Sequence, residues 1–178
     1  GDAAFRQAIF HGINRHTILD ICNDGNGTPC EDMFSLKVMG DYAGAAPFTG
    51  YDLEMAQAAL AETSVDLSQT FTIEVFDNDS AAIAQCIQGD LMMLGINTQV
   101  AQEDSNTWFE NLMSGNMQMG ISVFGTDMVG VEDMLSMLDP NSGYSFNISE
   151  ELIAAAQEAP AITDDEERKA AVIDVLNQ

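Results

Sequence analysis

A regular alternation of apolar runs and helical patterns fills the middle of the chain. Three runs are rich in β-branched and aromatic residues, as buried strands are, at 71–76, 96–100 and 119–124. Between them, residues 81–94 and 106–113 carry apolar side chains at helical spacing. Strands that alternate with helices of this length pair in parallel through right-handed crossovers. The sequence therefore predicts an α/β fold, a three-layer lobe whose central, mostly parallel sheet is flanked by helices.

Asp127 lies just past the end of the last predicted strand. In sheets of this kind, ligands bind beyond the carboxyl ends of the strands, so Asp127 is the first candidate for a ligand contact. The sequence contains no serine hydrolase elbow, phosphate-binding loop, dinucleotide-binding turn or zinc protease helix motif. It nominates no catalytic nucleophile and no cofactor, and we expect a protein that is not an enzyme.

The chain is long enough to bury a sizeable core, because 46% of its 178 residues are hydrophobic. We expect a single domain over residues 1–178, with a strand and helix core at 70–127. Glycine and proline break the helical pattern after residue 22, which predicts a long loop or arm over 23–50. Capping residues and apolar spacing predict helices over 149–178. No run approaches the roughly 18 apolar residues that a membrane span needs.

Acidic residues far outnumber basic ones. The chain has 29 Asp and Glu against five Lys and Arg, for a net charge of −24. Such a charge opposes binding to phosphate backbones and to anionic lipid, so we exclude nucleic acid as a partner. The acids are spread over predicted helix starts and loops, which is typical of a solvated surface. Salt adaptation and an acidic calcium binder are the alternatives for this composition.

Three cysteines without a C-x-x-C spacing are too few for a disulfide scaffold and argue against structural zinc. Cys22 and Cys30 flank a turn-rich segment that could bring them within bonding reach, so they are a candidate disulfide. Such a bridge would indicate a location outside the cytoplasm. Cys86 falls within the first predicted crossover helix, and we expect an inert core thiol there.

Several short motifs follow one another along the chain. They are F-R-Q-A-I at 5–9, I-N-R at 13–15, G-N-G-T-P at 25–29, Y-D at 51–52, L-G-I at 94–96 and D-E-E-R-K at 165–169. Their order and spacing resemble the C-terminal lobe of the family 5 extracellular solute-binding proteins, the peptide and nickel receptors of ABC importers. The resemblance covers nearly all of the chain and implies a class II periplasmic-binding-protein-like fold. It also implies one ligand-binding lobe of a longer two-lobe receptor.

The segment Phe124-Gly125-Thr126-Asp127-Met128 resembles the family motif W-x-A-D-Y, which faces the ligand cleft. In peptide-binding members its Asp pairs with the free α-amino group of the ligand, and the resemblance implies that role for Asp127. A carboxylate in a partly closed cleft is a good counter-ion for an ammonium group. A structural acid that caps the next helix is the alternative role for Asp127.

Three departures from the family pattern bear on the ligand. Phe124 replaces the motif's Trp, Ser105 stands where many members place a cleft Trp, and Leu112 stands where some peptide binders carry Arg. These departures weigh against the oligopeptide class and leave amine-bearing solutes open. Nickel-binding relatives lack the Asp, so Asp127 argues against nickel. The implied ligand-binding residues are Asp127, Phe124, Gly125, Thr126, Met128 and Ser105.

The resemblance implies a solute-binding component of an ABC importer. It would capture a peptide or another amine-bearing small solute outside the cytoplasm, in the periplasm or as a cell-surface lipoprotein, and deliver it to a membrane permease. Two alternatives belong to other classes. One is an acidic calcium-dependent interaction module. The other is a hydrolase on a similar α/β layer that uses Asp127 and Glu132.

Overall fold

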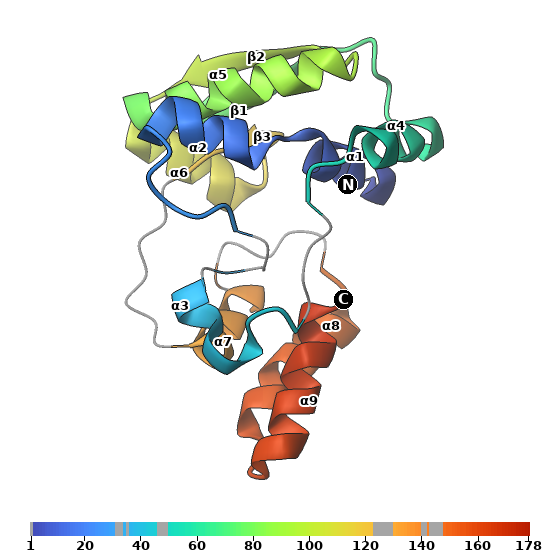
Figure 1. The fold of residues 1–178 in the computed structure, drawn as a ribbon, viewed down its shortest axis with the longest axis vertical. Coiled ribbons are helices and arrows are strands. Elements are labelled where there is room, and N and C mark those ends of the chain that lie inside the picture. The colour runs from blue at the N-terminus through green and yellow to red at the C-terminus, as the bar shows by residue number, and fades with distance from the viewer. Residues whose placement is uncertain are drawn as a thin grey trace. The chain divides into compact units, whose positions relative to one another are not determined.

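Two compact units make up the chain in the computed structural model (Figure 1). Unit 1 comprises Gly1–Pro29 with Thr49–Phe124, and unit 2 comprises Cys30–Phe48 with Gly125–Gln178. The structure describes residues 2–30, 34, 36–45, 50–122, 130–139, 142 and 148–178. That the two units together form one lobe of a longer receptor stays a prediction.

A three-stranded parallel sheet organises unit 1. β1 (Phe71–Val75) lies in the middle, with β2 (Thr98–Gln102) on one side and β3 (Met119–Gly120) on the other. Two helices connect the strands, α5 (Asn78–Met93) and α6 (Ser105–Ser114). The predicted order of strand, helix, strand, helix, strand is confirmed, and so is the parallel pairing.

Helices cover both faces of this sheet. Ile73 and Val75 of β1 are buried against Ala84 of α5. Glu74 lies between them in sequence and points the other way, because successive strand side chains alternate between faces, and it meets Asn111 of α6. The predicted three-layer arrangement of a sheet flanked by helices is therefore confirmed.

Local sequence explains where the crossover helices begin and end. Asp77 accepts a 2.7 Å hydrogen bond from Ser80 N and forms a capping box at the start of α5. Asp104 accepts from the backbone of Asn106 and Thr107 at the start of α6. Gly115 follows the last turn of α6 with a φ of 69°, a left-handed conformation that glycine adopts without strain.

The described part of unit 1 also contains α1 (Ala3–Gly12), α2 (Arg15–Asn23) and α4 (Leu53–Glu62). Asp2 caps α1 and also accepts hydrogen bonds from Thr63 and Ser64, which follow α4. These donors, the Ser64 hydroxyl first, hold the pKa of Asp2 well below its usual value. One carboxylate thus joins the beginning of α1 to the end of α4, and the two helices pack together.

Helices are the regular secondary structure in the described part of unit 2. It contains α3 (Leu36–Met39), η1 (Gly40–Tyr42), α7 (Val131–Met134), η2 (Leu135–Leu138), α8 (Glu150–Glu158), η4 (Ala159–Ala161) and α9 (Asp165–Leu176). Its core brings Met39 of α3 together with Leu135 of η2 and Val172 of α9, all almost fully buried. Among the described residues, no helix is both long and apolar enough to cross a membrane.

Residues 23–50 do not form only the loop or arm that the sequence predicts. α3 and η1 lie within this range, and Val38 and Met39 are part of the unit 2 core. A helix of one turn is too short to produce a hydrophobic period, so sequence spacing alone does not reveal it. Over 149–178, by contrast, α8 and α9 occupy the predicted helical region.

Candidate functional site: the carboxyl edge of the sheet

The three strands of unit 1 end at a common edge, which we term the carboxyl edge. β1 is followed by residues 76–77, β2 by residues 103–105, and β3 by residues 121–122. Ligands of open parallel sheets bind beyond this edge. Five of the six predicted site residues fall within 123–129, which follows residues 121–122 in the sequence and lies outside the described residues.

A buried carboxylate lies on β1 just before this edge. Glu74 is only 8% exposed, and its Oε2 accepts a hydrogen bond of 3.0 Å from Asn111 Nδ2. The same amide nitrogen donates to Glu103 Oε2 at 3.0 Å. Asn111 therefore joins one acid on β1 to another just past β2. Burial of a carboxylate costs free energy unless it is hydrogen-bonded, so Asn111 is needed to hold Glu74 inside.

The backbone carbonyl group of Glu74 holds α6 and the chain after β3 at the carboxyl edge. Its carbonyl oxygen accepts a hydrogen bond of 3.0 Å from Trp108 Nε1 and another of 3.1 Å from Ile121 N. The first contact fixes α6 to the sheet, and the second fixes the chain immediately after β3. The Glu74 carbonyl oxygen thus holds both α6 and Ile121 to the middle strand of the sheet.

Aromatic side chains form the apolar part of the carboxyl edge. The Phe76 ring lies 5.1 Å from Trp108 and 6.0 Å from Phe109, and the last two rings meet edge to face at 5.1 Å. Trp108 is buried, whereas Phe109 is 43% exposed. Such a cluster stabilises the edge and leaves one ring available to an apolar group. Sequence spacing marked Trp108 and Phe109 only as part of an apolar helical face.

The predicted site residues fall into two groups. Ser105 is the first residue of α6, follows the capping Asp104 and is exposed at the carboxyl edge. Asp127, Phe124, Gly125, Thr126 and Met128 lie outside the described residues. Their ligand-binding role stays a prediction.

The predicted bridge between Cys22 and Cys30 is not formed. Cys22, Cys30 and Cys86 are all described, and no disulfide joins any two of them. Cys30 Sγ donates to the Phe34 carbonyl oxygen at 3.0 Å, and Cys22 Sγ lies 3.8 Å from Cys86 Sγ. The reason is tertiary packing, because Cys22 lies near the end of α2, which packs against α5 and so directs this thiol toward Cys86.

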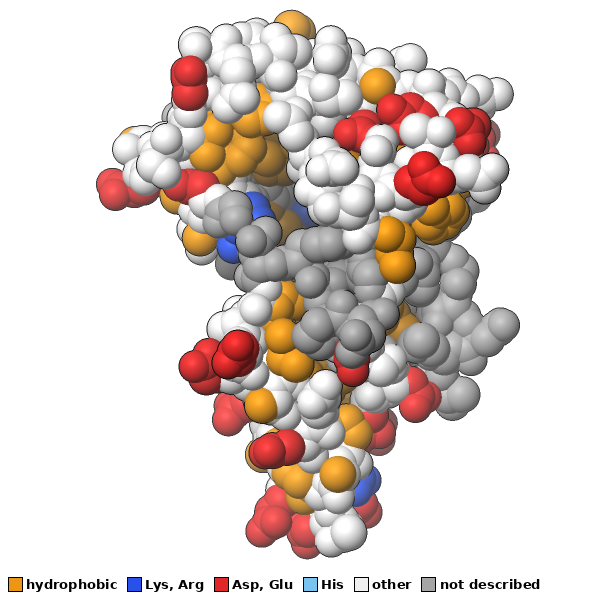
Figure 2. Space-filling model, turned by 180° about the vertical axis from the view of Figure 1, so that it is seen from behind, with side chains coloured by type: hydrophobic (Ala, Val, Ile, Leu, Met, Phe, Trp, Pro, Cys, Tyr) orange, Lys and Arg blue, Asp and Glu red, His pale blue; other side chains and the backbone are white. Residues whose placement is uncertain are grey.

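Acidic side chains are spread over the visible face of each unit, as expected for a solvated surface (Figure 2). Within the described ranges, no three His, Cys, Asp or Glu side chains gather in the way that a metal ion would need. The calcium-binding alternative gains no support from this part of the chain.

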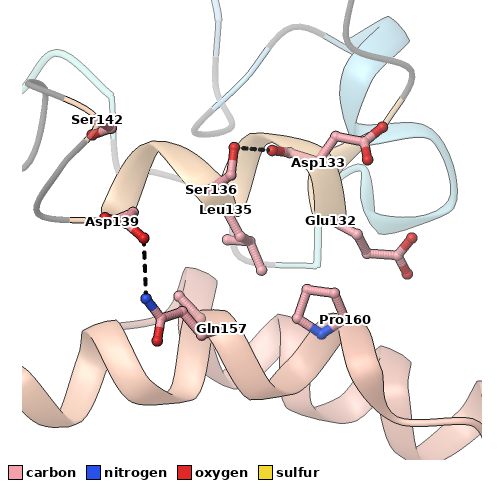
Figure 3. A pocket seen from close by; sticks show the side chains of 9 residues that line it. Glu132, Asp133, Leu135, Ser136, Asp139, Ser142, Gln157 and Pro160 are labelled. Atoms are coloured by element: carbon pink, nitrogen blue, oxygen red, sulfur yellow. Dashed lines mark hydrogen bonds between the residues drawn. The ribbon is translucent and has the colours of Figure 1, made fainter.

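A hollow of about 820 Å³ opens on unit 2, between the α7–η2 segment and the α8–η4 segment (Figure 3). Three of its lining residues are acids, Glu132, Asp133 and Asp139. Gln157 Nε2 donates to Asp139 Oδ2 at 3.3 Å across one end of it. The lining side chains do not converge on a common point, so the hollow does not have the geometry of a cation site.

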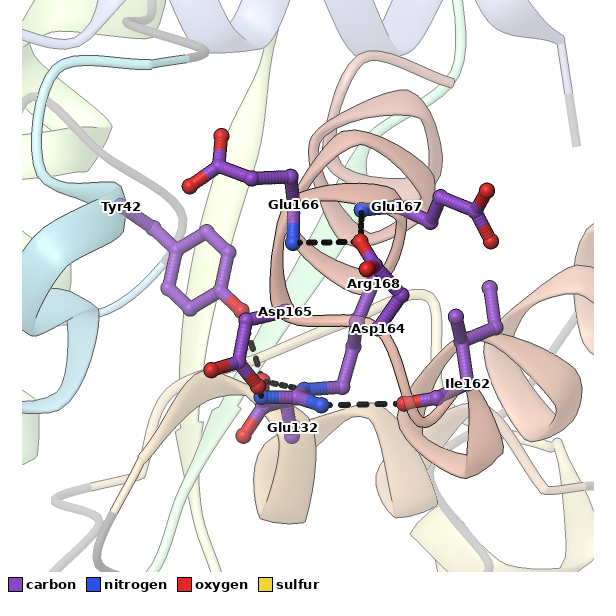
Figure 4. A network of polar contacts seen from close by, with 8 residues as sticks. All are labelled: Tyr42, Glu132, Ile162, Asp164, Asp165, Glu166, Glu167 and Arg168. Carbon is purple, nitrogen blue, oxygen red and sulfur yellow. Dashed lines mark hydrogen bonds and ion pairs between the residues drawn. The ribbon is translucent and has the colours of Figure 1, made fainter.

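Glu132, the second acid of the hydrolase alternative, has a structural role. Its Oε1 accepts hydrogen bonds from Tyr42 at 2.6 Å and from Arg168 at 3.1 Å (Figure 4). Arg168 also donates to Asp165 and to the Ile162 carbonyl oxygen. This network joins η1, α7 and α9, which accounts for an acid at this position without catalysis.

The sequence model of one protein family matches residues 1–146 of this chain. The family is described as bacterial extracellular solute-binding proteins, family 5 middle. A search of curated proteins found no match.

Solved structures share the fold over almost the whole chain. HbpA2 from Haemophilus parasuis superposes with a TM-score of 0.84 at 22% identity, covering 98% of this chain and 36% of that one. A dipeptide binding protein from Pseudoalteromonas sp. SM9913, in complex with Met-Leu, gives 0.78 at 18% identity over 98% and 36%. NikA from Brucella suis, in complex with Fe(III)-EDTA, gives 0.79 at 18% identity over 97% and 39%. The chain therefore spans less than two fifths of the length of these proteins.

Proposed function

This chain belongs to family 5 of the bacterial extracellular solute-binding proteins, and we propose that it forms one lobe of a two-lobe receptor for a peptide or another amine-bearing small solute. The receptor delivers its solute to the membrane permease of an ABC importer. In this proposal the receptor works outside the cytoplasm and is not an enzyme. The observation that carries it is the family match over residues 1–146.

The fold alone does not select the ligand. Two structures that share it hold chemically different molecules, Fe(III)-EDTA and Met-Leu. Asp127 is the feature that favours an amine, because a carboxylate beyond the carboxyl edge of the sheet is a suitable counter-ion for an ammonium group. In the proposal, Phe124, Gly125, Thr126 and Met128 flank this acid, and Ser105 contributes from the start of α6.

Geometry of the carboxyl edge supports this assignment. The strands converge on an edge that carries exposed Phe109 and exposed Ser105. The chain leaves β3 held by the Ile121 N–H on the Glu74 carbonyl oxygen. Ligand-binding residues commonly lie on segments that a rigid scaffold positions in this way.

Titration calorimetry with the two-lobe receptor tests the proposal. We expect short peptides with a free amino terminus to bind, and Asp127→Asn to weaken binding by about 2 to 5 kcal/mol because a buried charge-assisted pair is lost. N-acetylated peptides should bind the wild-type receptor as weakly as free peptides bind the variant. Glu110→Gln removes an exposed acid of α6 and is the matched control, for which we expect unchanged affinity.

Two results would contradict different parts of the proposal. If Asp127→Asn keeps full affinity, Asp127 is not the counter-ion, although the receptor function survives. If neither peptides nor other small amines bind to the wild-type receptor, the proposed solute class is wrong.

A further inference from the structure

Cys22 and Cys86 lie side by side although 64 residues separate them in the sequence. Their Sγ atoms are 3.8 Å apart, which is sulfur to sulfur contact. Cys22 comes from the last turn of α2 and Cys86 from the middle of α5. Both side chains are half-buried, so they pack against protein on one side and are accessible on the other.

The two helices that carry these thiols are held together at a second point. Asn14, which caps α2, donates its backbone N–H to Asp90 Oδ2 at 2.9 Å. Asp90 and Cys86 are four residues apart on α5 and share one face of that helix. α2 therefore runs along α5 from Asp90 toward Cys86, which brings Cys22 to its partner. Packing of α2 on α5 therefore brings the two side chains together.

We propose that Cys22 and Cys86 form a disulfide bond that locks α2 to α5 when the protein is in an oxidising compartment. Formation of the bond requires the sulfur atoms to move from 3.8 Å to about 2 Å apart, a change that side-chain rotation and a small helix shift can supply.

The reaction needs an oxidant, and a small or protein-borne disulfide such as oxidised glutathione supplies it. One cysteine thiolate attacks a glutathione sulfur, forms a mixed disulfide and releases one glutathione thiolate. The second cysteine thiolate then attacks the protein-bound sulfur, forms the Cys22–Cys86 bond and releases the second glutathione. The two thiol protons and the two electrons end on two molecules of reduced glutathione, so the exchange is balanced.

Burial, and then the contact with Cys22, raise the pKa of the Cys86 thiol. A raised pKa lowers the fraction of Cys86 that is thiolate, so unrelated electrophiles attack it more slowly than they attack an ordinary thiol. Once Cys22 carries a mixed disulfide, its sulfur lies close to Cys86, because the two Sγ atoms are 3.8 Å apart. This proximity raises the rate at which Cys86 attacks, despite the low reactivity of its thiol.

The bond would close a long loop. The closed loop would contain all residues between Cys22 and Cys86, including residues 30–48 of unit 2. In the chain-entropy account, closing a loop of this length restricts the unfolded chain strongly, and we expect the melting temperature of the oxidised protein to exceed that of the reduced protein by on the order of 10 °C.

The test equilibrates the purified protein with oxidised and reduced glutathione, alkylates remaining thiols under denaturing conditions, and maps the peptides by mass spectrometry. We expect a linked pair of peptides that contain Cys22 and Cys86, an alkylated Cys30, and a higher melting temperature that dithiothreitol reverses. Cys30→Ser is the matched control and should keep both the linked peptides and the shift. Cys22→Ser should lose both, and comparison of oxidised with reduced wild type needs no variant to fold.

Three outcomes would overturn the proposal. They are alkylation of Cys22, Cys30 and Cys86 after oxidation, a Cys22–Cys30 link, and a stable mixed disulfide with glutathione on Cys22 or Cys86. None of these readouts depends on ligand binding, so this experiment tests the disulfide independently of the proposed receptor function.

Discussion

The hydroxyl of Tyr42 donates a hydrogen bond of 2.6 Å to Glu132 Oε1. The contact joins η1, which comes early in the chain, to α7, which comes late, and it lies at the edge of the unit 2 core. A tyrosine that donates to a carboxylate resists ionisation, because a phenolate would lose the hydrogen bond and face a like charge. This relationship makes unit 2 sensitive to alkaline pH.

Burial first, and then the hydrogen bond with Glu132, raise the pKa of Tyr42 to about 12. A tyrosine in the unfolded chain ionises near pH 10, as a rule of thumb. Because the folded pKa is the higher one, Tyr42 contributes its full stabilisation below about pH 10 and loses it as the pH rises toward about 12. An ultraviolet absorbance titration should show one tyrosine that ionises late, and Tyr42→Phe should remove that component.

Tyr51 is the control for this titration because its side chain is exposed. Tyr51→Phe should leave the late component in place. Loss of the late component in Tyr51→Phe, or its persistence in Tyr42→Phe, would show that the contact with Glu132 does not set the alkaline limit.

Leu91 of α5 is fully buried against the sheet of unit 1, whereas its neighbour Met92 is 69% exposed. Leu91→Ala removes buried apolar volume and leaves a cavity, so we expect it to lower the free energy of unfolding by about 3 kcal/mol. Met92→Ala should change it by less than about 0.5 kcal/mol. Urea unfolding followed by circular dichroism measures both variants, and equal effects would contradict the placement of α5.

Asp77 caps α5, and the hydrogen bonds from the Ser80 hydroxyl and then from the Ser80 N–H lower its pKa. Because the folded pKa lies below the unfolded one, this stabilisation is present above roughly pH 4 and is lost as the pH falls further. Asp77→Asn should therefore flatten the loss of melting temperature in acid. An Asp77→Asn variant whose melting temperature still falls in acid as steeply as that of the wild type would contradict this role of the cap.

Trp108 is the only tryptophan of the chain, and its indole N–H donates to the Glu74 carbonyl oxygen at 3.0 Å. Trp108→Phe keeps an aromatic ring but removes this donor, so we expect a loss of about 1 kcal/mol in the free energy of unfolding. Phe109→Leu replaces the neighbouring, exposed ring and should cost less. A larger loss for Phe109→Leu would mean that the hydrogen bond is not what fixes α6 to the sheet.

The sheet of unit 1 was predictable because its signals are long and repeated. β1 and β2 are five residues each, and the helices between the strands provide several turns of apolar spacing. β2 nevertheless begins at Thr98, two residues after the predicted start. Gly95, at a φ of 80°, ends α5 in a turn, and Ile96 is buried in that turn before the strand begins.

Contacts between distant segments were not predictable in the same way. The turn-rich residues after Cys22 suggested a local partner, but packing of α2 on α5 gave Cys22 a partner far along the chain. The bridge from Asn111 joins α6 to Glu74 of β1 and to Glu103 just past β2, and polar residues at such positions look like ordinary surface residues in the sequence. For the candidate site, the ligand-binding roles of both Ser105 and Asp127 rest on the resemblance and stay predictions.

The chain passes between the two units three times, after Pro29, after Phe48 and after Phe124. On the ribosome, Val38 and Met39 therefore emerge well before α9, whose Val172 they need as a neighbour in the unit 2 core. Unit 1 can complete its sheet as soon as β3 has left the exit tunnel, while α3 still lacks its buried surroundings. Synthesis from the N-terminus thus imposes an order of folding. α3 is made early, between the two parts of unit 1, but it is among the last segments to be buried.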